Sequence, residues 1–277
     1  MIPEIWSSAL LSALRKTLVF AQPGVINRDY EGDIARAGDT VRINSLGRPT
    51  VRDFVVGTPL VRETLTDAQR VLVIDQQKYF DFEVDDINQR QAQGDLIQPT
   101  MNEAAYAVAD VVDRYIASLY TQVVSANNLG TISVPVATPT DFYDKVLVPL
   151  NVRLNEANVP KIGRYCVIPP WLEGRALLDS RFIKVNESGT EQGLRNGQIG
   201  RAAGFDIMMS NNTVNPTGDD YVVQAGTSQA ITFAEQINKT EGFRPDDGFS
   251  DAVKGLVLYG AKVIRPECLA VATVSQT

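Results

Sequence analysis

Two pairs of carboxylates lie close together in the chain and are its nearest approach to catalytic groups. Asp81 and Glu83 are two residues apart, and Asp85 and Asp86 follow them. Alternate residues of a strand share a face, so Asp81 and Glu83 are expected to project side by side, as the paired carboxylates of glycoside hydrolases do. Apolar residues alternate with these acids over 78–86, which favours a half-buried strand with an acidic outer face. A carboxylate-dependent hydrolase remains the distant alternative.

Other catalytic arrangements are missing from the sequence. The 277 residues include no histidine, which excludes Ser/His/Asp and Cys/His catalysis and histidine-ligated zinc. Cys166 and Cys268 form no C-x-x-C motif and lie in apolar stretches, which predicts buried free thiols and a reducing compartment. The glycine-rich GQIGRAAG at 197–204 lacks the spacing of a phosphate-binding loop. We therefore expect that the protein is not an enzyme and that it has no catalytic residues, no cofactor and no metal.

The bulk composition indicates a folded acidic protein. Hydrophobic residues make up 44% of the chain, its net charge is -7 and its pI is near 4.8. The charge argues against a basic surface that grips nucleic acid. The first twenty residues resemble a signal peptide only superficially, because Glu4 stands where a base is expected and Arg15 and Lys16 interrupt the apolar run. No run of 18 apolar residues exists, so no membrane span is expected.

One stretch, Pro99 to Ser125, predicts a helix of about twice the usual length. Its apolar residues recur at steps of three and four, which is the stripe of an amphipathic helix. Thr100 and Glu103 have the spacing of a capping box, and Pro99 is expected to bar helix before it. Asp113 is among the polar residues assigned to the other face. The expected stripe is Ala105, Val108, Ala109, Val112, Ile116, Leu119, Tyr120 and Val123.

Two segments before this helix have too little apolar surface nearby to be stable alone. Residues 1–20 predict a short amphipathic helix whose apolar face, which includes Trp6 and Leu10, needs a remote partner or another subunit. Residues 39–74 predict a long β-hairpin, and such hairpins are not stable alone in water. It carries the arginines Arg42, Arg48, Arg52, Arg62 and Arg70.

The rest of the chain predicts a compact α/β region followed by a long strand. Helices are expected at 141–157, with a kink at Pro149, and at 171–179. Short strands are expected at 165–168, 205–209, 221–224 and 231–233, a polar glycine-rich loop at 187–204, a long strand at 253–265 and a final strand at 269–274. Gly260, inside the long strand, indicates a bulge or close packing.

In the order and spacing of these parts, the chain resembles a tailed-bacteriophage major capsid protein of the Hong Kong 97 type. No single motif is diagnostic, and the resemblance covers nearly the whole chain. Its parts are EGDIARAGDTVRI (31–43), LVIDQQKYFDFEVDDINQRQA (72–92), the long helix, LNEANVPKIGRYCVIPP (154–170), LRNGQIGRAAGFDIMMSNN (194–212) and FSDAVKGLVLYGAKVIRPECLAV (249–271).

The resemblance implies an α+β fold with four parts. These are an N-arm at 1–38, an extended loop at 39–76, a peripheral domain at 77–125 and 241–265 whose spine is the long helix, and an axial domain at 126–240 and 266–277. It also implies a protein that self-assembles into pentamers and hexamers of an icosahedral head around double-stranded DNA, in the virion and assembled in the host cytoplasm. The implied partners are copies of itself, a separate scaffolding protein, a portal protein and, in some shells, a decoration protein, with no membrane.

One family feature cannot apply here. The member that gives the fold its name cross-links its shell covalently through a lysine of the extended loop, whereas this chain has no lysine between Lys16 and Lys78. We therefore expect non-covalent contacts, in which the five hairpin arginines meet Asp81, Glu83, Asp85 and Asp86 of a neighbour while Trp6 and Leu10 are buried on another copy. The main alternative is an encapsulin, a bacterial compartment shell that shares the fold and encloses enzymes.

Overall fold

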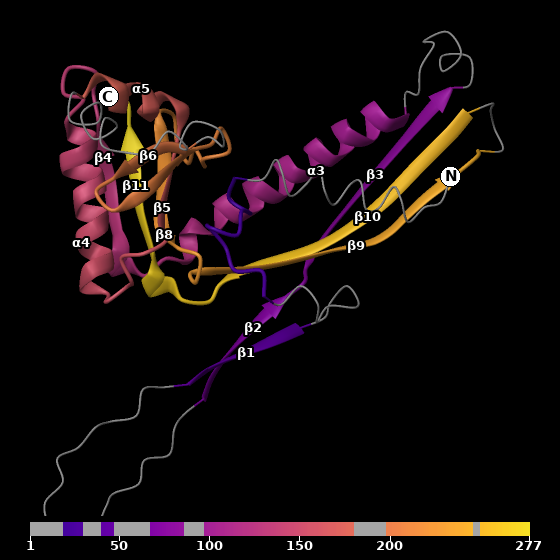
Figure 1. The fold of residues 1–277 in the computed structure, drawn as a ribbon, viewed down its shortest axis with the longest axis horizontal. Helices are drawn as coiled ribbons and strands as arrows, with labels where there is room; N and C mark the ends of the chain where they lie inside the picture. The colour runs from indigo at the N-terminus through magenta and orange to yellow at the C-terminus, as the bar shows by residue number, and fades with distance from the viewer. Residues whose placement is uncertain (1–18, 30–39, 47–66, 86–96, 180–197, 246–249) are drawn as a thin grey trace, which may run out of the picture.

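The computed structural model describes residues 19–29, 40–46, 67–85, 97–179, 198–245 and 250–277. Figure 1 shows three parts: a compact lobe, an elongated lobe in which a long helix lies along a sheet, and a two-stranded hairpin that projects from their junction. The fold is mixed α+β, as expected. Within the described ranges, none of the helices has the length and apolar character needed to cross a membrane.

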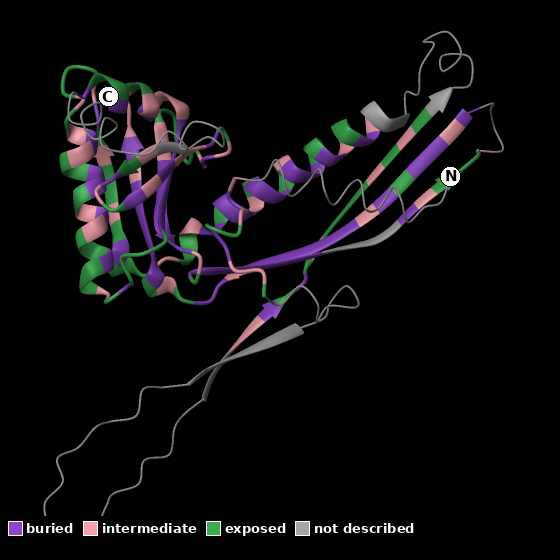
Figure 2. Ribbon diagram, in the orientation of Figure 1, coloured by how far each residue is buried: buried purple, intermediate pink, exposed green. Residues whose placement is uncertain are grey.

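The elongated lobe consists of the helix α3, Ile97–Ser118, and an antiparallel sheet. The strand order is β3 (Gln76–Asp85), β10 (Ser250–Val263) and β9 (Ile231–Phe243). The alternation predicted for β3 is confirmed, because Phe80 and Phe82 pack against the core while Asp81 and Glu83, which alternate with them, are exposed. Figure 2 shows the buried residues of α3 on the side that faces the sheet.

The predicted apolar stripe of α3 is confirmed. Its first six members are buried, and Tyr120 and Val123 are half-buried and pack against the same core. The Tyr115 ring also meets the Tyr259 ring of β10 edge-on, with 5.3 Å between centroids. The buried members are Ala105, Val108, Ala109, Val112, Ile116 and Leu119.

Both predicted ends of this helix were wrong, by two residues at its start and by seven at its end. The helix begins at Ile97, so Pro99 lies in its first turn, where a missing N–H and a fixed φ cost nothing. It ends at Ser118 and tightens into a 3₁₀ turn, Leu119–Gln122. Groups from other elements form hydrogen bonds with this end of the helix. The Gln224 side chain donates to the Ala117 carbonyl, and the Val263 N–H donates to the Gln122 side-chain oxygen at 3.3 Å.

The compact lobe is a six-stranded mixed sheet flanked by two helices. The expected helix at 141–157 is a π-helical turn, Phe142–Leu147, that continues into α4, Val148–Glu156. The helix α5 spans Pro170–Leu178. The strand order is β4 (Asn128–Ser133), β11 (Leu269–Ser275), β8 (Asp220–Thr227), β5 (Arg164–Ile168), β7 (Phe205–Met209) and β6 (Gln198–Ala202).

Two expectations for this lobe are corrected by local backbone geometry. Pro149 is the second residue of α4, and the irregularity lies before it as the π-helical turn. The described end of the glycine-rich stretch is not a loop but the strand β6. It is joined to β7 by Ala203 and Gly204, whose φ values of 50° and 83° are those of a tight hairpin turn. Residues 187–197 lie outside the described part.

The strand β9 differs most from the prediction. The expected short strand at 231–233 is a strand of 13 residues, and it pairs with β10 in the elongated lobe instead of joining the compact region. Three chain connections therefore link the lobes: α3 to β4, β8 to β9, and β10 to β11. One hydrophobic cluster includes buried residues of both lobes, so they share a core.

The predicted hairpin is confirmed at its base. Strand β1, Thr40–Leu46, pairs antiparallel with β2, Asp67–Val73, and residues 47–66 lie outside the described part. Leu72 and Ile74 are buried against β9 and β10 of the same chain. The hairpin base therefore packs against its own molecule, which supplies part of the support that a hairpin of this length needs.

Gly260 makes that contact close, as its place in the strand predicted. A Cβ added there would collide with the Val73 carbonyl oxygen and would lie 3.0 Å from the Ile74 Cα. The strand β10 can pass beneath the end of the hairpin only because position 260 has no side chain.

Candidate subunit-contact site

The described residues include only part of the predicted contact set. Arg42 lies on β1 and Asp85 on β3, where the backbone alone is described. Arg70, Asp81 and Glu83 are described with their side chains. The residues outside the described part are Trp6, Leu10, Arg48, Arg52, Arg62 and Asp86.

Arg70 is held partly by its own chain. Its Nη1 donates to the Val263 carbonyl at 3.4 Å, across the contact between β2 and the end of β10. Lys262 makes a similar bond to the Val71 carbonyl at 2.9 Å. These two cations attach the hairpin base to the elongated lobe.

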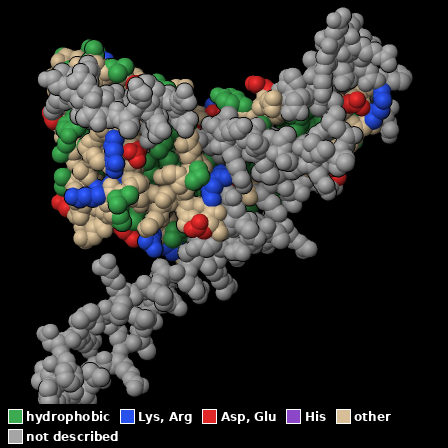
Figure 3. All heavy atoms as spheres, viewed as in Figure 1, with side chains coloured by type: hydrophobic (Ala, Val, Ile, Leu, Met, Phe, Trp, Pro, Cys, Tyr) green, Lys and Arg blue, Asp and Glu red, His purple; other side chains and the backbone are tan. Residues whose placement is uncertain are grey.

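The acidic face of β3 carries both signs of charge. Asp81 is exposed and pairs in register with Lys254, whose Nζ lies 3.2 Å from a Glu241 carboxylate oxygen and 4.9 Å from the centre of the Phe243 ring. Glu83 accepts a hydrogen bond from the Ser250 hydroxyl. On the face drawn in Figure 3, charges of both signs are likewise interspersed over the described surface.

The Asp81 and Glu83 carboxylates do not share a pocket. A hollow of about 200 Å³ on this face is lined by Asp81 but not by Glu83, which is turned toward Ser250. Nor do the described residues hold a cluster of three or more histidine, cysteine or acidic side chains placed to bind a metal ion. The arrangement is that of a charged sheet face and gives the hydrolase alternative no support.

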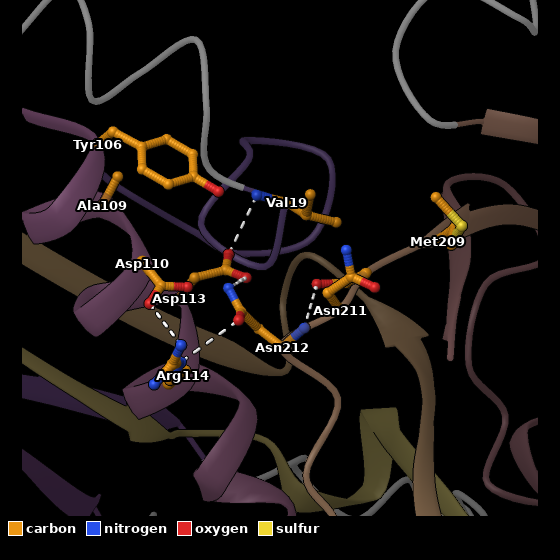
Figure 4. A pocket seen from close by; sticks show the side chains of 10 residues that line it. Val19, Tyr106, Ala109, Asp110, Asp113, Arg114, Met209, Asn211 and Asn212 are labelled. Carbon is orange, nitrogen blue, oxygen red and sulfur yellow. Dashed lines mark hydrogen bonds and ion pairs between the residues drawn. The ribbon is translucent and has the colours of Figure 1, made fainter. Parts of the chain in front are cut away.

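Asp113 is the functional candidate that the sequence reading missed. Its assignment to the outer face of the helix was wrong, because it is buried, with 3% of its surface exposed. One carboxylate oxygen accepts the Val19 N–H at 3.0 Å and the Phe20 N–H at 2.7 Å, and the other accepts the Asn212 side-chain amide at 3.1 Å. Figure 4 shows the bonds from Val19 and Asn212. Burial raises the pKa of the Asp113 carboxyl, and these hydrogen bonds oppose the rise.

Spacing could have placed Asp113 correctly. It lies four residues after Ala109 and three before Ile116, so it belongs to the same stripe as those buried residues. A carboxylate at a stripe position predicts a buried acid with polar partners, because an unpaired buried charge is strongly unfavourable.

Beside Asp113 lies a cleft of about 450 Å³ between α3 and the loop that follows β7. Tyr106, Asp110 and Arg114 line its helix side, and residues 209–212 line the other (Figure 4). Asp110 and Arg114 form an ion pair of 2.7 Å, and Arg114 also reaches the Asn212 side-chain oxygen at 3.4 Å. The first described residue of the chain, Val19, lies at the edge of this cleft.

The segment 19–29 is fastened to the body at its other end as well. Asn27 exchanges backbone hydrogen bonds of 2.9 Å with Ile231 and Phe233 of β9. Arg28 forms an ion pair of 3.1 Å with the buried Glu235 and lies 5.0 Å from the centre of the Phe233 ring. The segment 19–29 is therefore held to the body at both of its ends.

The prediction of buried free thiols is confirmed. Cys166, in β5, and Cys268 are both buried and unpaired. Burial raises the pKa of the Cys166 thiol to about 12, so it has little thiolate character at neutral pH.

Comparison with known proteins agrees with this architecture. A family model described as phage capsid protein matches residues 69–272. A structure from Mycobacterium phage Che8 is 32% identical, covers 92% of this chain and 90% of its own, and superposes with a TM-score of 0.69. The capsid structure of the cyanophage P-SCSP1u is 18% identical, with coverages of 95% and 90% and a TM-score of 0.73.

A more distant match is the SrpI encapsulin of Synechococcus elongatus. It is 10% identical, with coverages of 87% and 84% and a TM-score of 0.54, which shows a shared fold alone. No curated protein matches the chain.

These findings define the class as viral shell proteins with this mixed α+β fold. The chain belongs to the phage capsid protein family, which confirms the resemblance to tailed-phage major capsid proteins.

Proposed function

We propose that the chain is the major capsid protein of a tailed phage, assembling into the pentamers and hexamers of an icosahedral head that encloses double-stranded DNA. Family membership supports a shell, and the observation that carries the proposal is the hairpin. Its base is packed on the elongated lobe while β1 and β2 lead away from both lobes (Figure 1). A strand pair directed away from its own core favours contact with another copy.

Within this proposal the four parts follow the Hong Kong 97 arrangement. The N-arm is 1–38, the extended loop 39–76, the peripheral domain 77–125 with 241–265, and the axial domain 126–240 with 266–277. The strand β9 crosses the 240/241 boundary, so the peripheral sheet includes residues from Ile231 onward. The shell built from copies of the chain is a container, and the protein is not an enzyme.

The shell is held by non-covalent contacts between the hairpin arginines of one copy and the acidic β3 face of the next. Asp81 supports this role, because its side chain is exposed on β3. Each exposed pair contributes only about 0–1 kcal/mol. Repetition around a closed shell sets the register, while burial of the N-arm, at about 25 cal/mol per Å², supplies most of the free energy.

The salt dependence of particle melting tests these contacts. We expect the double variant Arg52→Ala with Arg62→Ala to melt at lower temperature than the parent particle and to lose part of its sensitivity to salt, since screening acts on exposed ion pairs. The matched control is Arg153→Ala, which removes an exposed ion pair of 3.3 Å within α4 of the same chain. An unchanged melting point and salt slope in the double variant would exclude the arginine contact.

The particle itself decides between the two kinds of shell. Electron microscopy of the protein from infected cells is expected to show heads with one portal vertex and packaged DNA. The further partners are a separate scaffolding protein during assembly in the host cytoplasm and, on some shells, a decoration protein. Particles without a portal that hold an enzyme would establish the encapsulin alternative, and a monomer on a sizing column would exclude both.

A further inference from the structure

The Asp113 carboxylate is shared by three segments that are far apart in the sequence. It projects from α3 and receives the N–H groups of Val19 and Phe20, which are 94 and 93 residues away, and the Asn212 amide, which is 99 residues away. The side chain is almost wholly buried. A buried carboxylate needs these donors, because each one replaces hydration that it has lost.

The three segments belong to three different parts of the molecule. The helix α3 is the long element of the elongated lobe (Figure 1), and Asn212 follows β7 of the compact lobe in the sequence. Val19 and Phe20 are where the first eighteen residues join the body, and we call residues 19–21 the arm root. A single side chain thus joins the arm root, the elongated lobe and the compact lobe.

The charged groups beside Asp113 orient the Asn212 amide. Arg114 donates to the Asn212 side-chain oxygen at 3.4 Å and is itself paired with Asp110 at 2.7 Å. With its oxygen engaged by a cation, the Asn212 amide presents its NH₂ group to Asp113 (Figure 4). The polar chain therefore runs from Asp110 through Arg114 and Asn212 to Asp113 and the arm root.

We propose that Asp113 is a positioning residue that couples the arm root to the compact lobe, so that release of either one from α3 loosens the other. If the loop after β7 moves away, the carboxylate loses one donor and water can enter to replace it. The same water competes for the oxygen that holds Val19 and Phe20. The coupling is a property of the single chain and does not depend on shell formation.

Amide hydrogen exchange of the full chain tests the coupling, with all variants compared in the same assembly state. Asn212→Ala removes a donor without touching the arm root. We expect it to speed exchange at Val19 and Phe20 about tenfold, because one lost buried hydrogen bond is worth roughly a factor of ten. Asp113→Asn is expected to do the same or more. Asn211→Ala, in the same loop but at an exposed residue, is the matched control and should leave those amides unchanged.

Exchange in β8 distinguishes coupling from general destabilisation. Amides of Val222 to Ala225 lie in the buried sheet of the compact lobe and should keep their protection in Asn212→Ala. Faster exchange at both places would mean global unfolding and would overturn the proposal. The proposal would also be overturned if Asp113→Asn lost the protection at the arm root while Asn212→Ala kept it. The carboxylate would then hold the arm root without coupling it to the compact lobe.

Discussion

The Glu235 carboxylate is buried in the elongated lobe. Its charged partner, Arg28, comes from the segment that precedes the hairpin. Arg28 pairs with the carboxylate at 3.1 Å, and 7% of Glu235 is exposed. We expect Arg28→Ala to lower the free energy of unfolding by about 3–5 kcal/mol, because it leaves an unpaired buried charge. Replacing both residues by methionine should recover most of that loss. Denaturant unfolding of the unassembled chain measures both effects.

The exposed pair on α4 provides the reference for this prediction. Arg153→Ala removes the 3.3 Å contact with Glu156 and should change the free energy of unfolding by less than about 1 kcal/mol. Equal effects of Arg28→Ala and Arg153→Ala would mean that the buried pair has no structural importance.

The cysteines allow a second prediction about single residues. Because burial raises the pKa of Cys166 to about 12, its thiolate is scarce and inaccessible at pH 8. We expect a thiol-alkylating reagent to leave Cys166 and Cys268 unmodified in the folded chain and to label both in denaturant. Mass spectrometry of the intact protein gives the count. Labelling of Cys166 in the folded chain would contradict the buried position of β5.

At the scale of elements, hydrophobic periodicity predicted the structures that one face of a strand or helix defines. Strands β7 and β11 and the stripe of α3 follow their patterns closely. The strand β9 was not recognised beyond Phe233, because Glu235 breaks the apolar pattern and is buried only through Arg28, more than 200 residues away. The residues next to Glu235 in the sequence give no sign of a partner that lies so far away along the chain.

The crossing of β10 beneath the hairpin gives a prediction at this scale. Gly260→Ala should destabilise the folded chain by about 1–3 kcal/mol, because the new methyl group would meet the Val73 carbonyl and force the hairpin base away from β10. Gly174→Ala is the matched control, since nothing lies within 4 Å of a Cβ there and alanine favours the helix α5. Thermal unfolding compares the two, and equal melting temperatures would show that the close approach does not constrain the fold.

At the scale of the whole molecule, the sequence predicted the set of parts better than their connections. The separate compact region, the long helix and the projecting hairpin were expected from local patterns. The order of strands in the six-stranded sheet joins segments from 128 to 275, and no local pattern encodes that order. The shared core explains why the lobes form one body, since one hydrophobic cluster contains buried residues of the long helix and of both sheets.

The shared core also separates folding from assembly. Every described residue of the shared core lies outside 47–66, so a chain in which Leu46 is joined to Asp67 through Asn-Gly keeps the described core and can close β1 and β2 with a tight turn. We expect this variant to unfold cooperatively at a temperature close to that of the unassembled parent, as measured by circular dichroism. It should form no particles in a sizing column or in the electron microscope, because the proposed contact with a neighbour has been removed. Particles of normal size would show that residues 47–66 are dispensable for the shell, and the contact would then have to be sought on the lobes.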